Sequence, residues 1–235
     1  MIIFIDYKKK IVFICPPKCG NNSIAKYLNI PLHNEYSNDD ILSVLNDDNY
    51  IKLFVIRKNI IERFLSGFYE DLFNNACYDN LEITFKDYLK FLFLCFKNKI
   101  NNVKNIEING NILPIYYGNC SNLELSITDE NGNFQSHIQT QKYTLQHYVN
   151  FYNIKLIEIN DLNILFGKNI NLNKKEKINE KINISNIKLK LLKKNLIIIN
   201  SDCLTDSEKE IILEIYNEDI TFIKELESTF KYYNI

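Results

Sequence analysis

Apolar runs separated by polar segments divide this chain into predicted strands and helices. Residues 2–6 and 11–15 are apolar runs on either side of the lysine-rich residues 7–10, which predicts a β-hairpin with a solvated turn. Residues 51–56 and 154–159 are two further, largely apolar runs, and they predict buried strands. A segment with helical periodicity follows three of these four runs. This alternation is typical of an α/β protein with a central, mostly parallel sheet flanked by helices.

The longest helices are predicted from apolar periodicity and from capping residues. Apolar side chains recur at helical spacing over residues 60–72. A second helix is predicted from Thr84, where Asp87 completes an approximate capping box. A third is predicted to run from a capping box at residues 204–208 to about Phe230.

Three further segments have weaker patterns. Residues 144–152 predict a helix, and residues 161–166 predict a short helix that Gly167 ends. Residues 99–133 lose periodicity and are rich in Asn, Gly and Ser, which predicts loops with short strands that shape a ligand site. Residues 171–188 are biased toward lysine and asparagine, which predicts a mobile loop or a solvated helix.

Composition and charge limit the class of protein. With 235 residues, 46% of them hydrophobic, the chain is expected to form one globular domain over residues 1–235. A net charge of -1 argues against a nucleic-acid partner, so any cationic site is local. No apolar run approaches the ~20 residues of a membrane span, and we expect a soluble, cytoplasmic protein. The six cysteines form no C-x-x-C pair, so no metal site is expected.

The segment IVFICPPKCGNNSIAKYL, residues 11–28, has the residue types of an anion-binding loop. A helix that begins just after a buried strand directs unpaired N–H groups and the positive end of its dipole at the space above the sheet. Gly20 allows the backbone to approach an anion closely, and Lys18 adds a mobile positive charge. Short polar side chains that can cap the helix or contact the anion follow at Asn21, Asn22 and Ser23. An ordinary strand-to-helix turn with a solvated lysine is the alternative interpretation.

This loop differs from the Walker A loop of nucleotide kinases. The pattern G-x-x-x-x-G-K-[ST] places its lysine after the second glycine, whereas Lys18 precedes the single glycine of this loop, Gly20. A P-loop nucleotide kinase, which would depend on ATP and magnesium, is therefore disfavoured.

A second cationic corner follows the strand predicted at residues 51–56. Arg57 and Lys58 come directly after that strand, and Ser66 lies two to three helical turns after this corner. Ligands of open α/β sheets collect beyond the carboxyl ends of the strands, so Lys18 and Arg57 are expected to face one crevice. Ser66 and its neighbour Gly67 also fit a purely structural role in close helix packing.

Both segments resemble motifs of the PAPS-dependent sulfotransferase family, in particular its carbohydrate sulfotransferase branch. PPKCGNNSIAKYL is similar to the family's P-K-x-G-x-x-S loop for the 5′-phosphosulfate, and RKNIIERFLSGFYE is similar to its R-x-P-x-x-R-x-x-S-x-Y segment for the 3′-phosphate. Later segments extend the resemblance: FQSHIQTQ is similar to a His-x-x-x-Gln stretch near the acceptor, and residues 154–163 and 204–223 are similar to a later strand and the terminal helix.

The resemblance implies a P-loop-like three-layer fold and transfer of a sulfuryl group from PAPS to a hydroxyl acceptor, either a small molecule or a glycan. Adenosine 3′,5′-bisphosphate would be the product, and no metal is required. Lys18 would stabilise negative charge on the bridging oxygen. Ser66 would hold the 3′-phosphate together with Arg57 or Lys58. The residues that correspond to the 5′-phosphosulfate loop are Pro17, Lys18, Cys19, Gly20, Asn21, Asn22 and Ser23.

The second motif departs from the family pattern at its first arginine. That arginine precedes the serine by eight residues in the family but by nine here, so Lys58 rather than Arg57 occupies the strict register. The usual proline is replaced by Asn59 or Ile60, depending on the alignment. Arg57 reaches the 3′-phosphate through a bulged corner, or Lys58 does so without bidentate geometry, and both possibilities stay open.

An acceptor hydroxyl also needs a general base, and histidine suits this role near neutral pH. We select His137 because it lies in the polar segment FQSHIQTQ, with Glu62 or Glu70 as alternative bases. His147 lies within a predicted helix and His33 in a predicted surface loop. A rival interpretation is a degenerate sulfotransferase fold that binds a nucleotide or sulfated glycan without turnover, which the shifted arginine and lost proline favour.

Overall fold

A computed structural model describes most of the chain, and it divides into two compact units. The first unit comprises Met1–Asn59, Thr140–Asn173 and Glu218–Ile235, and the second comprises Ile60–Gln139 and Lys174–Asn217. We describe each unit by itself, and a single domain over residues 1–235 stays a prediction. The described residues are 2–31, 36–74, 82–98, 105–108, 111–114, 140–167, 185–195 and 199–234.

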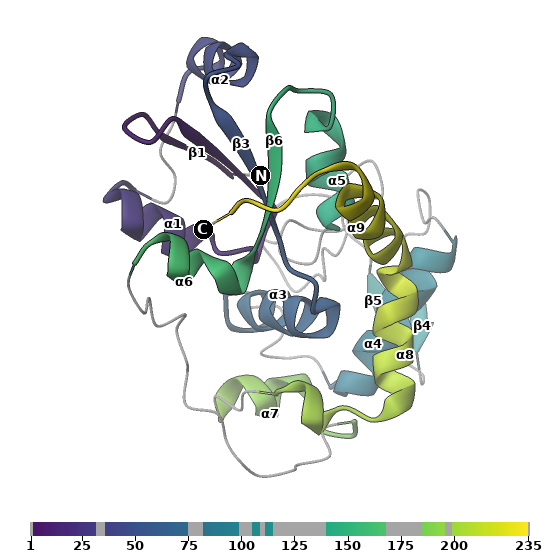
Figure 1. The fold of residues 1–235 in the computed structure, drawn as a ribbon. Helices are drawn as coiled ribbons and strands as arrows, with labels where there is room; N and C mark the ends of the chain where they lie inside the picture. The colour runs from purple at the N-terminus through teal and green to yellow at the C-terminus, as the bar shows by residue number, and fades with distance from the viewer. Residues whose placement is uncertain are drawn as a thin grey trace. The chain divides into compact units, whose positions relative to one another are not determined.

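The first unit contains a four-stranded sheet in the order β1-β2-β3-β6 (Figure 1). Strand β1 (Ile2–Asp6) pairs antiparallel with β2 (Ile11–Cys15), whereas β3 (Ile51–Ile56) and β6 (Ile154–Glu158) continue the sheet in parallel. The predicted hairpin and both later strands are therefore confirmed. So is the α/β class with a mostly parallel central sheet.

The near-continuous apolar runs are explained by burial of both faces of this sheet. Phe13 pairs with Leu53, and Ile14 pairs with Phe54, so neighbouring strands place side chains of the same face side by side. All four side chains are fully buried. Strands covered on both faces lack the alternation of polar and apolar residues that marks a half-exposed sheet.

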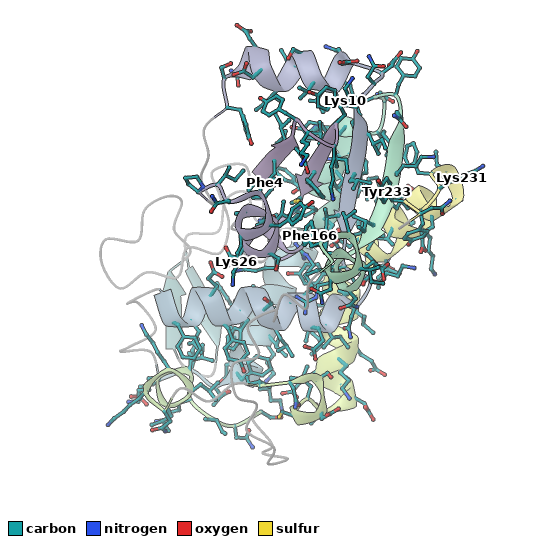
Figure 2. The ribbon with its side chains drawn as sticks, turned by 60° about the vertical axis from the view of Figure 1, so that its left-hand side comes forward. Phe4, Lys10, Lys26, Phe166, Lys231 and Tyr233 are labelled. Atoms are coloured by element: carbon teal, nitrogen blue, oxygen red, sulfur yellow. The ribbon has the colours of Figure 1, made fainter. Side chains whose placement is uncertain are left out.

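Helix α1 (Asn21–Leu28) and helix α6 (Leu162–Leu165) contribute to the apolar cluster on one face of the sheet. The Tyr27 ring stacks on Phe166 with centroids 4.0 Å apart, and Phe166 meets Phe13 edge-on. Figure 2 shows Phe4 and Phe166 on this side of the sheet, and both belong to the same cluster. A short 3-10 helix, Ile159–Asp161, leads from β6 into α6, and Gly167 ends α6 as predicted.

The C-terminal segment packs against Phe54 on the sheet and along β6. Helix α9 (Asn217–Thr229) is followed by Phe230, whose ring lies edge-on to Phe54 with centroids 6.1 Å apart. The chain then runs beside β6: the N–H of Leu156 donates to the Lys231 carbonyl at 3.0 Å, and the N–H of Tyr233 donates to the Leu156 carbonyl at 2.8 Å. The tail thereby covers part of the edge of β6.

Two other helices belong to the first unit. Helix α2 (Asn38–Asn46) begins at a capping box in which Ser37 and Asp40 exchange hydrogen bonds. Helix α5 (Gln141–Leu145) begins at Thr140, whose hydroxyl accepts from the N–H of Tyr143, and continues into a 3-10 turn, Gln146–Tyr148.

The second unit is mainly helical and contains a small β-hairpin. Phe68 lies at the centre of its aromatic core, with ring centroids 5.1 Å from both Phe85 and Tyr88. Capping boxes at Thr84 and Thr205 begin two of its helices, as the sequence predicts. Its elements are α3 (Ile60–Asn74), α4 (Phe85–Asn98), β4 (Asn105–Ile108), β5 (Asn111–Pro114), α7 (Leu189–Lys194), a 3-10 turn (Ser201–Cys203) and α8 (Asp206–Ile215).

Two predicted helices have the wrong bounds. The helix expected over residues 144–152 begins earlier, because Thr140 caps α5, and it has ended by Tyr148. The long helix expected to reach Phe230 is two helices, since Tyr216 leaves helical geometry at φ -102° and ψ 20°. Acidic residues just after the break favour a new helix N-terminus there, because they complement its dipole.

Two predicted features lie wholly or partly outside the described residues. The loop or solvated helix expected at residues 171–188 lies outside them except for its last four positions, and much of the segment 99–133 does too. Within that segment β4 and β5 confirm that short strands are present. Among the described residues, no helix combines the length and the apolar character that crossing a membrane requires.

Candidate functional site

The loop between β2 and α1 is built around two residues with positive φ. Lys18 has φ 64° and Gly20 has φ 89°, and the N–H of Cys19 donates to the Pro16 carbonyl at 3.2 Å to close a turn. Gly20 is the N-cap of α1, and its carbonyl accepts from the N–H groups of Ser23 and Ile24. The left-handed conformation at Gly20 is one that glycine adopts at little cost.

Packing against α6 also requires a glycine at this position. A Cβ atom at Gly20 would lie 2.8 Å from Cδ1 of Leu162, which is closer than real Cβ contacts. The backbone of the loop therefore rests directly on the apolar side chains that follow β6. This contact holds the start of α1 in place at the carboxyl end of β2.

The first turn of α1 has the properties of an anion site. No described residue accepts a hydrogen bond from the backbone N–H of Gly20, Asn21 or Asn22, and no acidic residue occupies the first turn. Exposed Asn22 and buried Ser23 both lie within this turn, and Asn21 has a buried Oδ1 that no described residue contacts by a hydrogen bond. Unpaired amides and the helix dipole together favour a bound anion.

Lys18 differs in burial from the two residues beside it. Lys18 is half-buried, whereas Pro17 and Cys19 are buried, with Cys19 fully inside the apolar cluster of the first unit. The Cys19 thiol donates to Oε1 of Gln141 at 3.3 Å. The sulfur therefore faces the buried Gln141 side chain rather than solvent.

The two cationic corners lie together. The guanidinium of Arg57 donates from Nη1 to the Lys18 carbonyl at 3.4 Å, so the residue that follows β3 contacts the loop that follows β2. Arg57 is half-buried at this position. The structure thus brings Lys18 and Arg57 to the same end of the sheet, where parallel strands collect ligands.

Gln141, the glutamine of the stretch that resembles His-x-x-x-Gln, connects these corners from the start of α5, and the sequence does not predict these contacts. Its Oε1 accepts from the N–H of Arg57 at 2.9 Å, and its Nε2 donates to the Arg57 carbonyl at 3.0 Å. Its own backbone N–H donates to Oδ2 of Asp219 at 2.9 Å, and the N–H of Lys142 donates to Oδ1 of Asp219 at 2.8 Å. Gln141 and Asp219 are both fully buried.

Lys58 points to the C-terminal segment. Its Nζ lies 2.6 Å from Oε1 of Glu227 and 4.8 Å from the ring centroid of Tyr232. The Tyr232 hydroxyl donates to the same Glu227 oxygen at 2.6 Å. Hydrogen bonds to Glu227 and Tyr232 hold the pKa of Lys58 above its usual value, and the same contacts lower the pKa of Glu227.

The other predicted site residues lie in the second unit or outside the described residues. Ser66 is half-buried on α3, and Glu62 on the same helix accepts from the N–H of Ser201 at 3.3 Å. His137 and His33 lie outside the described residues, and His147 is exposed beside Tyr143. Ser66 therefore belongs to a different unit from Lys18 and Arg57.

Three of the residues that complete this site carry little signal in the sequence. Gln141 falls in the segment that resembles a His-x-x-x-Gln stretch, and Asp219 falls in the segment that resembles the terminal helix, but neither resemblance assigns a contact. Glu227 has no motif at all. Each contacts a partner far away along the chain, so only the fold reveals its role.

The described residues contain no group of three or more His, Cys, Asp or Glu side chains that could hold a metal ion. Comparisons of the chain with protein-family models, with curated proteins and with solved structures find no match in any of the three. The contacts of Arg57 and the amides at the start of α1 make this site a cationic, amide-lined corner at the carboxyl ends of β2 and β3.

Proposed function

We propose that the chain is a sulfotransferase that moves a sulfuryl group from PAPS to a hydroxyl acceptor of the carbohydrate class. The observation that carries this proposal is the contact of Arg57 with the Lys18 carbonyl, because it unites two cationic corners. A ligand with a phosphosulfate at one end and a phosphate at the other requires two such groups. The order of the two motifs along the chain, each after a strand, adds support.

The amides at the start of α1 would hold the 5′-phosphosulfate, with Asn22 and Ser23 beside them. Lys18 would stabilise the negative charge that develops on the bridging oxygen. In the transfer step, the acceptor oxygen forms a bond to sulfur while the bond from sulfur to the bridging oxygen breaks. The acceptor proton passes to a base, for which His137 remains the residue proposed from the sequence.

Arg57 is the better candidate for the 3′-phosphate than Lys58. Lys58 is paired with Glu227 and Tyr232, so binding a phosphate would break an existing ion pair. Arg57 already lies beside the anion loop, and its guanidinium can bind a phosphate through two parallel hydrogen bonds. Ser66, on α3 of the second unit, stays a 3′-phosphate candidate on the resemblance alone.

The same proposal extends the fold to a P-loop-like three-layer architecture. Within the first unit, α1 and α6 share an apolar cluster with one face of the parallel strands, while Phe230 contacts Phe54 on the sheet. The anion loop follows β2, a parallel strand in the middle of the sheet. The helices α1 and α6 would then form one of the outer layers that the resemblance implies.

Thermal unfolding with different ligands tests the donor site. We expect adenosine 3′,5′-bisphosphate to raise the melting temperature, and equal concentrations of ATP or inorganic sulfate to raise it much less. Sulfuryl transfer from labelled PAPS to a panel of sugars and simple alcohols then tests the activity. Equal stabilisation by ATP and the bisphosphate would contradict the proposed donor.

A second candidate function is a binding module of the same fold that lacks turnover. One specific observation favours it. Lys58 occupies the position of the family's first arginine, and it forms an ion pair with Glu227 and lies over the ring of Tyr232. Such a module would bind the bisphosphate or a sulfated glycan but transfer no sulfate to any acceptor. Measured binding together with inactive transfer would select this candidate over the enzyme.

A further inference from the structure

One oxygen atom contacts both halves of the candidate site. Oε1 of Gln141 accepts from the Arg57 N–H at 2.9 Å and from the Cys19 thiol at 3.3 Å. Arg57 follows β3 and Cys19 lies in the loop after β2. An amide oxygen has two lone pairs, and both are used here, one for each corner.

The NH2 group of the Gln141 side chain fixes the orientation of the amide. Nε2 of Gln141 donates to the Arg57 carbonyl at 3.0 Å, so the side chain pairs with both the N–H and the carbonyl of one residue. The side chain thus replaces the peptide group of a neighbouring strand. Glutamate or methionine at this position would lose one or both of these hydrogen bonds.

The backbone of Gln141 is itself held in place. Asp219 on α9 accepts from the N–H groups of both Gln141 and Lys142, and Thr140 caps the same helix. Because Gln141 and Asp219 are fully buried, water cannot replace these hydrogen bonds without opening the structure. Hydrogen bonds therefore fix both the backbone of Gln141 and its side-chain amide.

We infer that Gln141 is a positioning residue that sets the distance between the anion loop and Arg57, an inference that rests on the proposed function for its role in ligand binding. A ligand with two anionic ends has a fixed range of distances between them. The two corners must keep a matching distance to bind both ends at once. Loss of the Gln141 amide removes this partner from the partly buried N–H and carbonyl of Arg57 and lets both corners move. Binding of the proposed bisphosphate is therefore expected to weaken when the two corners move.

The test compares Gln141→Met with Gln146→Met in the full chain. Both substitutions remove an amide of the same kind, but Gln146 is exposed in the 3-10 turn after α5. We expect Gln141→Met to speed amide hydrogen exchange at residues 18–22 and 57–59 while exchange in β2 and β3 stays unchanged. It should also raise the dissociation constant for the bisphosphate about tenfold. Gln146→Met should change neither measurement.

Gln141→Glu serves as a second variant if methionine prevents folding, because it preserves the size of the side chain, removes the donor and adds one negative charge. Exchange that is unchanged at either corner, or faster throughout the strands, would overturn the assignment of a positioning role. Unchanged affinity despite faster exchange at both corners would do the same. If the wild-type protein does not bind the bisphosphate, the proposed function fails, and the exchange measurement alone decides whether Gln141 holds the two corners.

Discussion

Lys58 and Glu227 form an ion pair with 2.6 Å between Nζ and Oε1, and the Tyr232 hydroxyl donates to the same carboxylate oxygen. This relationship separates two adjacent cations that the sequence leaves equivalent. Arg57 contacts the anion loop, whereas Lys58 contacts the C-terminal segment. The two side chains therefore have different roles although one peptide bond joins their residues.

Arg57→Ala and Lys58→Ala form a matched pair, since each removes one positive charge from the same corner. We expect Arg57→Ala to weaken bisphosphate binding by at least about tenfold, because a charged hydrogen bond to phosphate is lost. Lys58→Ala should weaken it by less than about threefold, the effect of a more distant charge. Isothermal titration calorimetry measures both constants. A larger loss for Lys58→Ala would transfer the 3′-phosphate role to Lys58.

The ion pair of Glu227 predicts a pH dependence of stability. Hydrogen bonds from Lys58 and Tyr232 lower the pKa of Glu227, so the ionised carboxylate stabilises the folded state at neutral pH. That contribution is present above the ordinary carboxylate pKa and is lost as pH falls through the lowered value. We expect Glu227→Gln to reduce the free energy of unfolding by up to about 1 kcal/mol at pH 7, because the pair is partly exposed.

Urea unfolding at several pH values measures this effect, and Glu225→Gln is the control because it removes the same charge from the same helix. The difference between wild type and Glu227→Gln should disappear in acid, while Glu225→Gln should stay close to wild type throughout. A constant difference at all pH values would show that protonation of Glu227 is not its origin.

The local features of the site are predictable from the sequence because they depend on neighbouring residues. Apolar runs predict all four strands of the sheet, and the polar residues after two of them predict where the site lies. Gly20 is predictable as a position of close approach, and its φ of 89° has that local origin. Capping boxes likewise predict the start of α4 and of α8, since each involves residues three apart.

The contacts that join the corners are not predictable in this way, because they depend on the fold. Gln141 and Arg57 are 84 residues apart, and Cys19 and Gln141 are 122 residues apart. No local pattern assigns a buried glutamine at the start of a helix to the backbone of the residue that follows β3. The end of α8 is missed for a related reason: apolar periodicity continues past Tyr216 although its backbone leaves the helical region.

Lys18→Ala tests the role proposed for the loop lysine in catalysis. Lys18 is expected to stabilise charge on the bridging oxygen mainly in the transition state, so turnover should fall by about 10²-fold or more. Binding of the bisphosphate should fall much less, since the backbone amides of the loop remain. Lys26→Ala is the control because Lys26 is an exposed lysine in the last turn of α1. Unchanged turnover in Lys18→Ala would reject the assignment.

Gly20→Ala should destabilise the protein for two separable reasons. The residue has φ 89°, and its new Cβ would lie 2.8 Å from Cδ1 of Leu162. We expect a loss of about 3 kcal/mol, the sum of backbone strain and the steric conflict. Gly167→Ala isolates the first cause, because Gly167 has φ 63° and no atom within 4 Å of the added Cβ. Its cost should be about 1 kcal/mol.

A double-mutant cycle isolates the second cause. Leu162→Ala removes the atom in conflict, so Gly20→Ala should cost less in the Leu162→Ala background than in the wild type. We expect a coupling free energy of about 1 kcal/mol between the two sites, measured by urea unfolding. Strictly additive effects would mean that the loop avoids Leu162 by moving, in which case the bisphosphate affinity of Gly20→Ala should fall with its stability. A measurable coupling free energy together with unchanged bisphosphate affinity would instead show that the Leu162 side chain moves while the loop after β2 retains its geometry.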